Sequence, residues 1–271
     1  QQILFGDIST FPEKHLNARD GDDPFFQGQA EVKGYFALAA FEERVLPQIK
    51  MLPKTLENLQ VSRTVKQNFD LFARDTLATY AADYERAYVQ YYDAHDVREF
   101  SRQILPYVAQ QLSSPGSPLL ILLKQIRDST NFPPAESNPY LKPFEGVASR
   151  FAVARSVVGK AATTSPNWAA YANIVAGLAE RLDNSKPYAP KKEDQYAVLK
   201  AELSPYAREA LDFLLQVPQS AFDQLETWLR TSKLRRKWQR PFRGFFNRIL
   251  ELGIQDLEEM MLARWADDYE E

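Results

Sequence analysis

The chain has 271 residues, of which 45% are hydrophobic and 25% charged, and its formal net charge at pH 7 is −3. This composition is typical of a folded globular protein and argues against a disordered chain. The small net charge argues against a protein that binds nucleic acid over its whole surface. The absence of cysteine excludes disulfides, thiolate nucleophiles and cysteine zinc sites.

The start of the chain is irregular and carries no targeting signal. It opens with Gln1-Gln2 rather than methionine, and no signal peptide follows. We therefore expect a cut fragment or a processed product of a longer parent, which can carry a membrane anchor of its own. The longest apolar run, Leu119–Leu123, is far shorter than the about 20 residues of a membrane-spanning helix. We expect residues 1–30 to form an irregular leader, because Asp20-Gly21-Asp22-Asp23-Pro24 is a turn signal.

From residue 35 onward the apolar residues recur at helical spacing. The clearest example runs from Phe69 to Tyr91, where most steps are three or four residues. Alternating strand patterns are absent, so the fold class predicted is all-α, an elongated multi-helix bundle. The expected helices cover residues 36–50, 62–91, 95–112, 118–129, 139–158, 166–183, 193–216, 219–231 and 239–267.

Four of these helices are marked by a capping side chain followed by proline. The pairs are Ser117-Pro118, Asn138-Pro139, Ser165-Pro166 and Ser204-Pro205. The Ser or Asn oxygen can accept an orphan backbone N–H, and proline at the first helical position loses no hydrogen bond. The first three pairs predict helix starts. The fourth interrupts a periodic stretch and predicts either a kink or a break between two shorter helices, and Pro106 is expected to bend the helix over 95–112.

The organisation expected is one helical domain over residues 31–185 and a second over 186–271. The boundary is placed in the stretch from Asp183 to Lys192, which contains Pro187 and Pro190. No internal repeat of fixed period is present.

Residue patterns that carry chemistry are weak throughout. The two histidines, His15 and His95, lie far apart, and we interpret His95 as a helix-cap or surface residue rather than a catalytic partner of Asp96. Val158-Gly159-Lys160 resembles the end of a phosphate loop but lacks the required earlier glycine and the Ser or Thr after the lysine. We predict no catalytic residue, no cofactor, no metal site and no enzymatic activity.

The aromatic stripe over Phe69–Tyr91 has two interpretations. Aromatic side chains at helical spacing can form a ligand groove or a platform on which nucleic-acid bases stack. More often such a stripe belongs to the core, with tyrosine hydroxyls reaching its rim. We favour the core.

The one unusual charge pattern lies near the C-terminus. Residues 227–250 contain eight basic side chains and no acidic one, interleaved with Trp238, Phe242, Phe245 and Phe246, and the block after it is mostly acidic. The candidate partner surface consists of Lys233, Arg235, Arg236, Lys237, Trp238, Arg240 and Arg243. Because the two blocks are similar in size, we expect them to complement each other within the chain or across a contact with another protein. Binding of lipid or nucleic acid through residues 230–248 is the alternative.

The central part of the sequence contains Tyr80-x3-Tyr84-x3-Tyr88, followed by Ser117-Pro118-Leu119-Leu120-x-Leu122-Leu123-x2-Ile126-x3-Thr130. This pattern resembles the periplasmic helical region of the TssM (IcmF-type) proteins of type VI secretion systems. The segment from Gly34 to Pro47 fits the region just upstream in that family, and Asn138–Phe144 fits its proline-started helix downstream. It covers about residues 30–230, and Tyr88 stands where tryptophan is usual in the family.

The resemblance implies a scaffold segment of the secretion machine's envelope-spanning membrane complex. It places the chain in the periplasmic part of an inner-membrane protein, with other membrane-complex subunits, including further copies of itself, as partners. The β-rich tail that contacts the outer-membrane lipoprotein TssJ in that family has no counterpart here, so contact with TssJ is not expected through this segment. A helical adaptor unrelated to secretion remains a competing interpretation.

Overall fold

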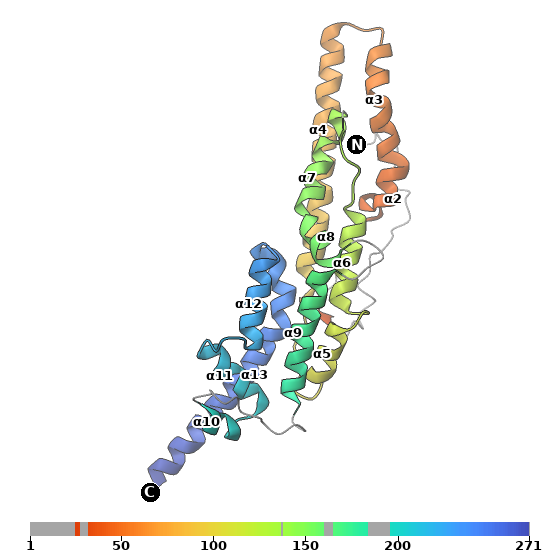
Figure 1. The fold of residues 1–271 in the computed structure, drawn as a ribbon. Helices are drawn as coiled ribbons and strands as arrows, with labels where there is room; N and C mark the ends of the chain where they lie inside the picture. Colours follow the sequence, from red (N-terminus) through yellow and green to blue (C-terminus); the bar gives the residue numbers. More distant parts are fainter. Residues whose placement is uncertain (1–24, 28–31, 137, 160–164, 184–195, 271) are drawn as a thin grey trace. The chain divides into compact units, whose positions relative to one another are not determined.

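The computed structural model describes residues 25–27, 32–136, 138–159, 165–183 and 196–270, and 78% of these residues are helical (Figure 1). The predicted all-α, multi-helix class is therefore confirmed. Most of the expected leader, with His15, and the centre of the expected boundary at 183–192 lie outside the described residues. Within the described residues, no helix combines the length and apolarity needed to cross a membrane.

The described elements are mostly α-helices. The α-helices are α2 (Leu38–Ala40), α3 (Leu46–Asn58), α4 (Arg63–Ala94), α5 (Leu105–Ser113), α6 (Pro118–Ser129), α7 (Lys142–Arg150), α8 (Ala152–Val158), α9 (Pro166–Leu182), α10 (Ala197–Glu202), α11 (Pro205–Leu214), α12 (Ala221–Thr231) and α13 (Arg236–Glu270). Two 3₁₀ turns, η2 (Gly34–Phe36) and η4 (Pro139–Leu141), and one π turn, η3 (Phe41–Val45), join them. Two strands of two residues each, β1 (Phe26–Gln27) and β2 (Asp96–Val97), complete the described elements.

The chain divides into two compact units that are not simple halves of the sequence. Unit 1 holds residues 1–95 and 122–155, and unit 2 holds residues 96–121 and 156–271. This division differs from the expected boundary at 186, because residues 96–121 belong with the later part of the chain. Within unit 2, α5 packs along α9, a pairing between segments far apart in sequence that local composition does not reveal.

The core of unit 1 is built on the tyrosines of α4. Leu77, Tyr80, Tyr84 and Tyr88 are fully buried, which confirms the core interpretation of the stripe, although Phe72 near its start is 44% exposed. Phenylalanines from other elements of unit 1 surround them, with ring centroids 4.7–6.3 Å apart: Phe36, Phe41, Phe132, Phe144 and Phe151. Figure 1 shows α3 and α4 running antiparallel in this unit.

The hydroxyls of Tyr80, Tyr84 and Tyr88 each have a specific acceptor. Tyr80 donates to the carbonyl of Tyr35 at 2.7 Å, and Tyr84 donates to the carbonyl of Ser129 at 2.5 Å. Tyr88 donates to the carbonyl of Phe36 at 3.2 Å, and in each case the acceptor lies outside α4. A buried hydroxyl without an acceptor lowers stability. These hydrogen bonds therefore allow each tyrosine ring to be buried together with its polar end.

Helix starts follow the predicted proline pairs. Ser165 and Ser204 accept hydrogen bonds from the backbone N–H groups of Asn167 and Ala207, both at 3.1 Å, and Asn138 accepts one from Tyr140. Ser204-Pro205 marks a break between α10 and α11 rather than a kink. Ser117 is the exception. It precedes α6 at the predicted place, but its hydroxyl has no hydrogen-bond partner in the described part of the chain.

Three sequence-based expectations about elements need correction. The helix expected over 95–112 begins only at Leu105, and Pro106 lies in its first turn instead of bending it. The first long helix runs to Asn58 rather than 50, because Pro53 is accommodated inside it. His95 ends α4 as its C-cap, as interpreted, but it is buried rather than on the surface, and its Nδ1 lies 2.5 Å from the carbonyl oxygen of Tyr91.

The core of unit 2 is also aromatic. Tyr171 of α9, Trp228 of α12 and Phe242 of α13 form a cluster in which each pair of ring centroids is 5.0–5.1 Å apart. The indole N–H of Trp228 donates to the carbonyl of Asn167 at 2.8 Å, which ties α12 to α9. Helix α11 packs along α13 so closely that only glycine fits at position 253.

Candidate interaction surface

The basic residues singled out in the sequence come together on unit 2, around the connection between α12 and α13. Ser220 caps α12 by accepting from the N–H of Asp223 at 3.2 Å. After α12 the chain turns at Lys233, whose φ of 54° is left-handed, and the N–H of Trp238 then bonds to the carbonyl of Arg235 at 2.8 Å. This turn places the cations of the connection beside those in the first turns of α13.

The side chains in this region separate into an apolar inner face and a basic outer face. Trp238 is 2% exposed, and Phe242, Phe245 and Phe246 are fully buried within unit 2. By contrast, five of the basic residues are exposed: Lys233, Arg235, Arg236, Lys237 and Arg240. We call these five residues the basic surface. Trp238, which the sequence suggested as part of a partner surface, is instead an internal anchor.

Arg243 is the seventh predicted residue, and it is already engaged. Its guanidinium bonds both carboxylate oxygens of Glu226 on α12, one of them at 2.8 Å, and also the side-chain oxygen of Gln239. The pair clamps α12 to α13. Lys233, Arg235, Arg236 and Lys237 have no carboxylate within salt-bridge distance in the described part of the chain.

The expected pairing between the basic block and the acidic block is limited in the described residues. Arg248 joins the two blocks through Glu251 at 3.0 Å. Asp256 of the acidic block instead pairs with Arg102, and Arg264 pairs with Glu202 of α10. Asp256 and Arg264 therefore contact other parts of unit 2, while Lys233, Arg235, Arg236 and Lys237 remain exposed.

The charges of α13 oppose its macrodipole. Its first turn contains basic Arg236 and Lys237 and no acidic residue, and its last turn contains no basic residue. Cations near a helix N-terminus and carboxylates near its C-terminus lower helix stability by a few tenths of a kcal/mol each, to about 1 kcal/mol. These charges are therefore not placed to stabilise the helix.

A second surface feature was missed in the sequence. Beyond the part of α13 that packs on α11, Met261 and Leu262 are each 65% exposed and Trp265 is 61% exposed. Figure 1 shows this end of α13 continuing past α10 and α11. The available signal was the spacing of Ile254, Leu257, Met261 and Trp265 by three or four residues, which places them on one side of the helix.

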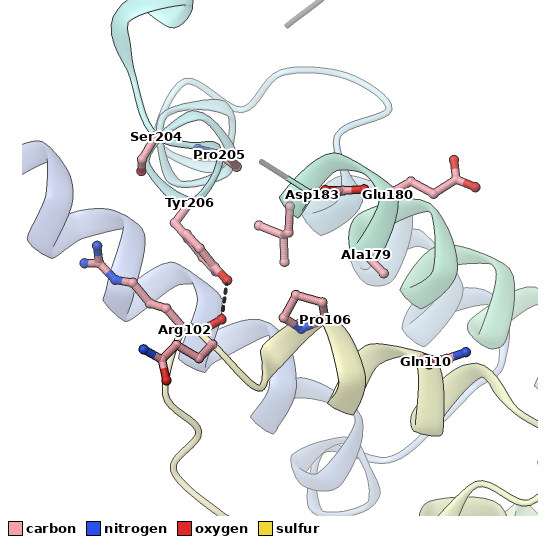
Figure 2. Close-up of a pocket in the computed structure, with 11 residues that line it drawn as sticks. Arg102, Pro106, Gln110, Ala179, Glu180, Asp183, Ser204, Pro205 and Tyr206 are labelled. Carbon is pink, nitrogen blue, oxygen red and sulfur yellow. Dashed lines mark hydrogen bonds between the residues drawn. The ribbon is translucent and has the colours of Figure 1, made fainter. Parts of the chain in front are cut away.

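Unit 2 also carries an open hollow of about 750 Å³ beside α5, α9 and the start of α11 (Figure 2). Figure 2 shows the hydroxyl of Tyr206 pointing to Arg102, and it donates to the Arg102 carbonyl at 3.1 Å. The Arg102 guanidinium pairs with Asp256, and Ser204 bonds the same carboxylate. Burial raises the pKa of Tyr206, against the opposing effect of the Arg102 charge. These contacts join the segment just before α5 to α11 and α13.

The other motifs weighed in the sequence form no reactive arrangement in the described residues. Gly159 follows the end of α8 with a φ of 81°, and Lys160 lies outside the described residues. No group of three or more His, Asp or Glu side chains that could hold a metal is present in the described part of the chain. The predicted absence of enzymatic activity and of a cofactor stays a prediction.

Comparison with known proteins gives no relative: no family model, no curated protein and no solved structure matches the chain.

Proposed function

We propose that the chain is a non-enzymatic scaffold segment of the envelope-spanning membrane complex of a type VI secretion system. It belongs to the periplasmic portion of an inner-membrane protein and acts through protein–protein contacts. The resemblance to TssM-type proteins supports both the periplasmic location and the assignment to a type VI secretion system. The chain is built from helical units with aromatic cores, in which tyrosine hydroxyls bond within the chain. Such units supply a shape and a surface for partners, which supports a scaffold role.

One observation carries the choice of a protein partner. In the first half of α13 the aromatic side chains are buried inside unit 2, while Arg236, Lys237 and Arg240 of the same helix are exposed. A helix that inserts into a membrane surface uses an apolar face for that purpose, and single-stranded nucleic acid is bound by stacking on exposed aromatics. In the first half of α13, the apolar face and the aromatic side chains are both buried in the core of unit 2. The basic surface is therefore suited to an acidic protein surface, where charge complementarity governs partner choice.

The test is site-specific photo-cross-linking in the cell with the full-length protein. A photoreactive residue replaces Lys233 or Arg240 in the basic surface, and Lys54 of α3, which is also exposed, serves as the control position. We expect adducts with another membrane-complex subunit or another copy from both basic-surface positions and none from the control. Adducts with cytoplasmic proteins, or no protein adduct from either position, would contradict the proposal.

The second candidate, an anionic-surface binder, is favoured only by the positive charge of residues 230–248. It is separated by measuring binding to anionic vesicles and to DNA at about 0.15 M salt, where the Debye length is about 8 Å. The comparison is between the wild type and the triple variant Arg235→Glu, Arg236→Glu, Lys237→Glu. We expect weak binding by both. Tight wild-type binding that is lost in the variant and falls steeply with salt would establish the second candidate instead.

A further inference from the structure

The two ends of α13 carry complementary surfaces. The basic surface lies at its start, and exposed carboxylates of Glu258 and Glu259 accompany the exposed apolar residues at its other end. Arg264 in that region is paired with Glu202, so its charge is largely neutralised. We call Glu258, Glu259, Met261, Leu262 and Trp265 the helix-end surface.

These two surfaces cannot meet within one copy of the chain. Positions 237 and 261 belong to the same helix, and 24 residues at a rise of 1.5 Å separate them by about 36 Å. Any contact between these two surfaces therefore joins two molecules.

We propose that the helix-end surface of one copy binds the basic surface of a second copy, in a head-to-tail contact. Glu258 and Glu259 pair with the exposed cations of the partner, and the ring of Trp265 receives an arginine guanidinium of the basic surface. Guanidinium groups stack on aromatic rings and bond carboxylates in a bidentate manner, so an arginine-rich surface suits an aromatic residue flanked by carboxylates. Met261 and Leu262 pack against the aliphatic stems of those arginines and lysines.

The charges also decide against the simplest alternative, a symmetric pairing of two helix ends. Such a contact would bring Glu258 and Glu259 of both copies together, and like charges across an interface disfavour it. A head-to-tail contact is heterologous, so each copy keeps one surface of each kind available for the next copy, giving rings or chains. This inference rests on the protein-facing role proposed above for the basic surface.

The experiment uses sedimentation velocity over a range of protein concentrations at low salt and at 1 M salt. Variant A carries Arg235→Glu, Arg236→Glu and Lys237→Glu, and variant B carries Met261→Asp and Trp265→Ala. The control is Met51→Asp on α3, since Met51 is 54% exposed and lies in unit 1. Circular dichroism and urea unfolding verify that every variant retains the wild-type fold.

We expect the wild type and the Met51 control to associate with increasing concentration, and the association to be lost at 1 M salt, where the Debye length is about 3 Å. Variants A and B each remain monomeric alone. A mixture of A and B forms heterodimers and nothing larger, because A retains the helix-end surface and B retains the basic surface.

Three outcomes would overturn the inference: a monomeric wild type at the highest soluble concentration, self-association of variant A with loss only in variant B, or no heterodimer in the mixture. The second of these would indicate symmetric pairing of helix ends. A monomeric wild type together with cross-links from Lys233 to another membrane-complex subunit would overturn the self-association and leave the proposed function in place.

Discussion

Gly253 of α13 lies directly against the backbone of Tyr206 on α11. A Cβ at position 253 would lie 2.8 Å from the carbonyl carbon of Tyr206, closer still to its oxygen, and 2.7 Å from the Cβ of Ala210. The two helices therefore pack backbone to backbone, and any side chain at 253 forces them apart. This contact joins α11 to the part of α13 just before the helix-end surface.

Gly253→Ala is expected to lower the free energy of unfolding by about 1–3 kcal/mol, the usual cost of overpacking a closely packed interior. Gly177→Ala on α9 is the matched control in the same unit, because a Cβ there meets nothing within 4 Å. The control should be stabilised by roughly 0.5–1 kcal/mol, since alanine favours a helix over glycine. Urea unfolding measures both, and equal effects of the two substitutions would refute the close approach.

Local signals predicted the elements better than they predicted the packing. The proline pairs at 118, 166 and 205 were sufficient because capping and the missing proline N–H act within one turn. The end of the first helix was placed at residue 50, whereas α3 continues through Pro53 to Asn58 although a proline inside a helix removes one backbone hydrogen bond. Residues 96–121 group with α9 and α13 through contacts between segments far apart in the sequence, and no local pattern encodes such contacts.

The sequence predicted only part of the candidate surface, again because burial depends on packing between distant segments. The five exposed cations follow from charge alone, but the burial of Trp238 depends on which face of α13 meets α9 and α12. For the same reason, the exposure of the apolar residues at the end of α13 was not predicted. Apolar spacing at Met261 and Trp265 normally indicates a buried face, and only the tertiary arrangement shows that α11 does not extend that far.

The buried tyrosines predict a loss of stability at alkaline pH. Burial raises the pKa of Tyr84 well above its usual value near 10, and burial with the Asp70 hydrogen bond raises the pKa of Tyr140 to about 12. The folded state therefore holds these protons more tightly than the unfolded state. Their contribution is fully present below pH 10 and is lost as the pH rises from 10 through 12.

Tyr84→Phe should lower stability at pH 7 by about 1 kcal/mol, because the carbonyl of Ser129 loses its hydrogen-bond donor. Above pH 10 the same variant should lose stability less steeply than the wild type, by up to about 1.4 kcal/mol per pH unit. Tyr107→Phe, at a 56% exposed position, is the control and should leave the curve unchanged. Denaturant unfolding from pH 7 to 11.5 provides the measurement, and parallel curves for Tyr84→Phe and the wild type would contradict the prediction.

The buried ion pair between α10 and α11 predicts strong coupling between its partners. The Lys200 ammonium lies 2.5 Å from the Asp212 carboxylate, and the lysine side chain is only 4% exposed. Lys200→Met leaves the carboxylate without its cation and should cost about 3–5 kcal/mol, whereas Lys200→Met with Asp212→Leu should cost much less than the two single changes together. Arg86→Met, in the exposed pair with Asp83, should cost at most about 1 kcal/mol. Additive single effects in the double-mutant cycle would show that the pair is not coupled.

The charges at the start of α13 oppose the helix macrodipole, so replacing them with carboxylates is predicted to stabilise the chain. Arg236→Glu and Lys237→Glu should each raise the free energy of unfolding by about 0.3–1 kcal/mol at low salt, because a carboxylate in the first turn interacts favourably with the helix N-terminus. Arg243→Glu is the contrasting variant two turns later, where the arginine is paired with Glu226. It should lower stability by up to about 1 kcal/mol, since the pair is lost and two carboxylates then face each other. Urea unfolding at low and at 1 M salt measures both effects, and the high salt should shrink both toward zero. A loss of stability in Arg236→Glu equal to that in Arg243→Glu would mean that the basic surface is held by contacts within the chain, and would remove the reason to assign it to a partner.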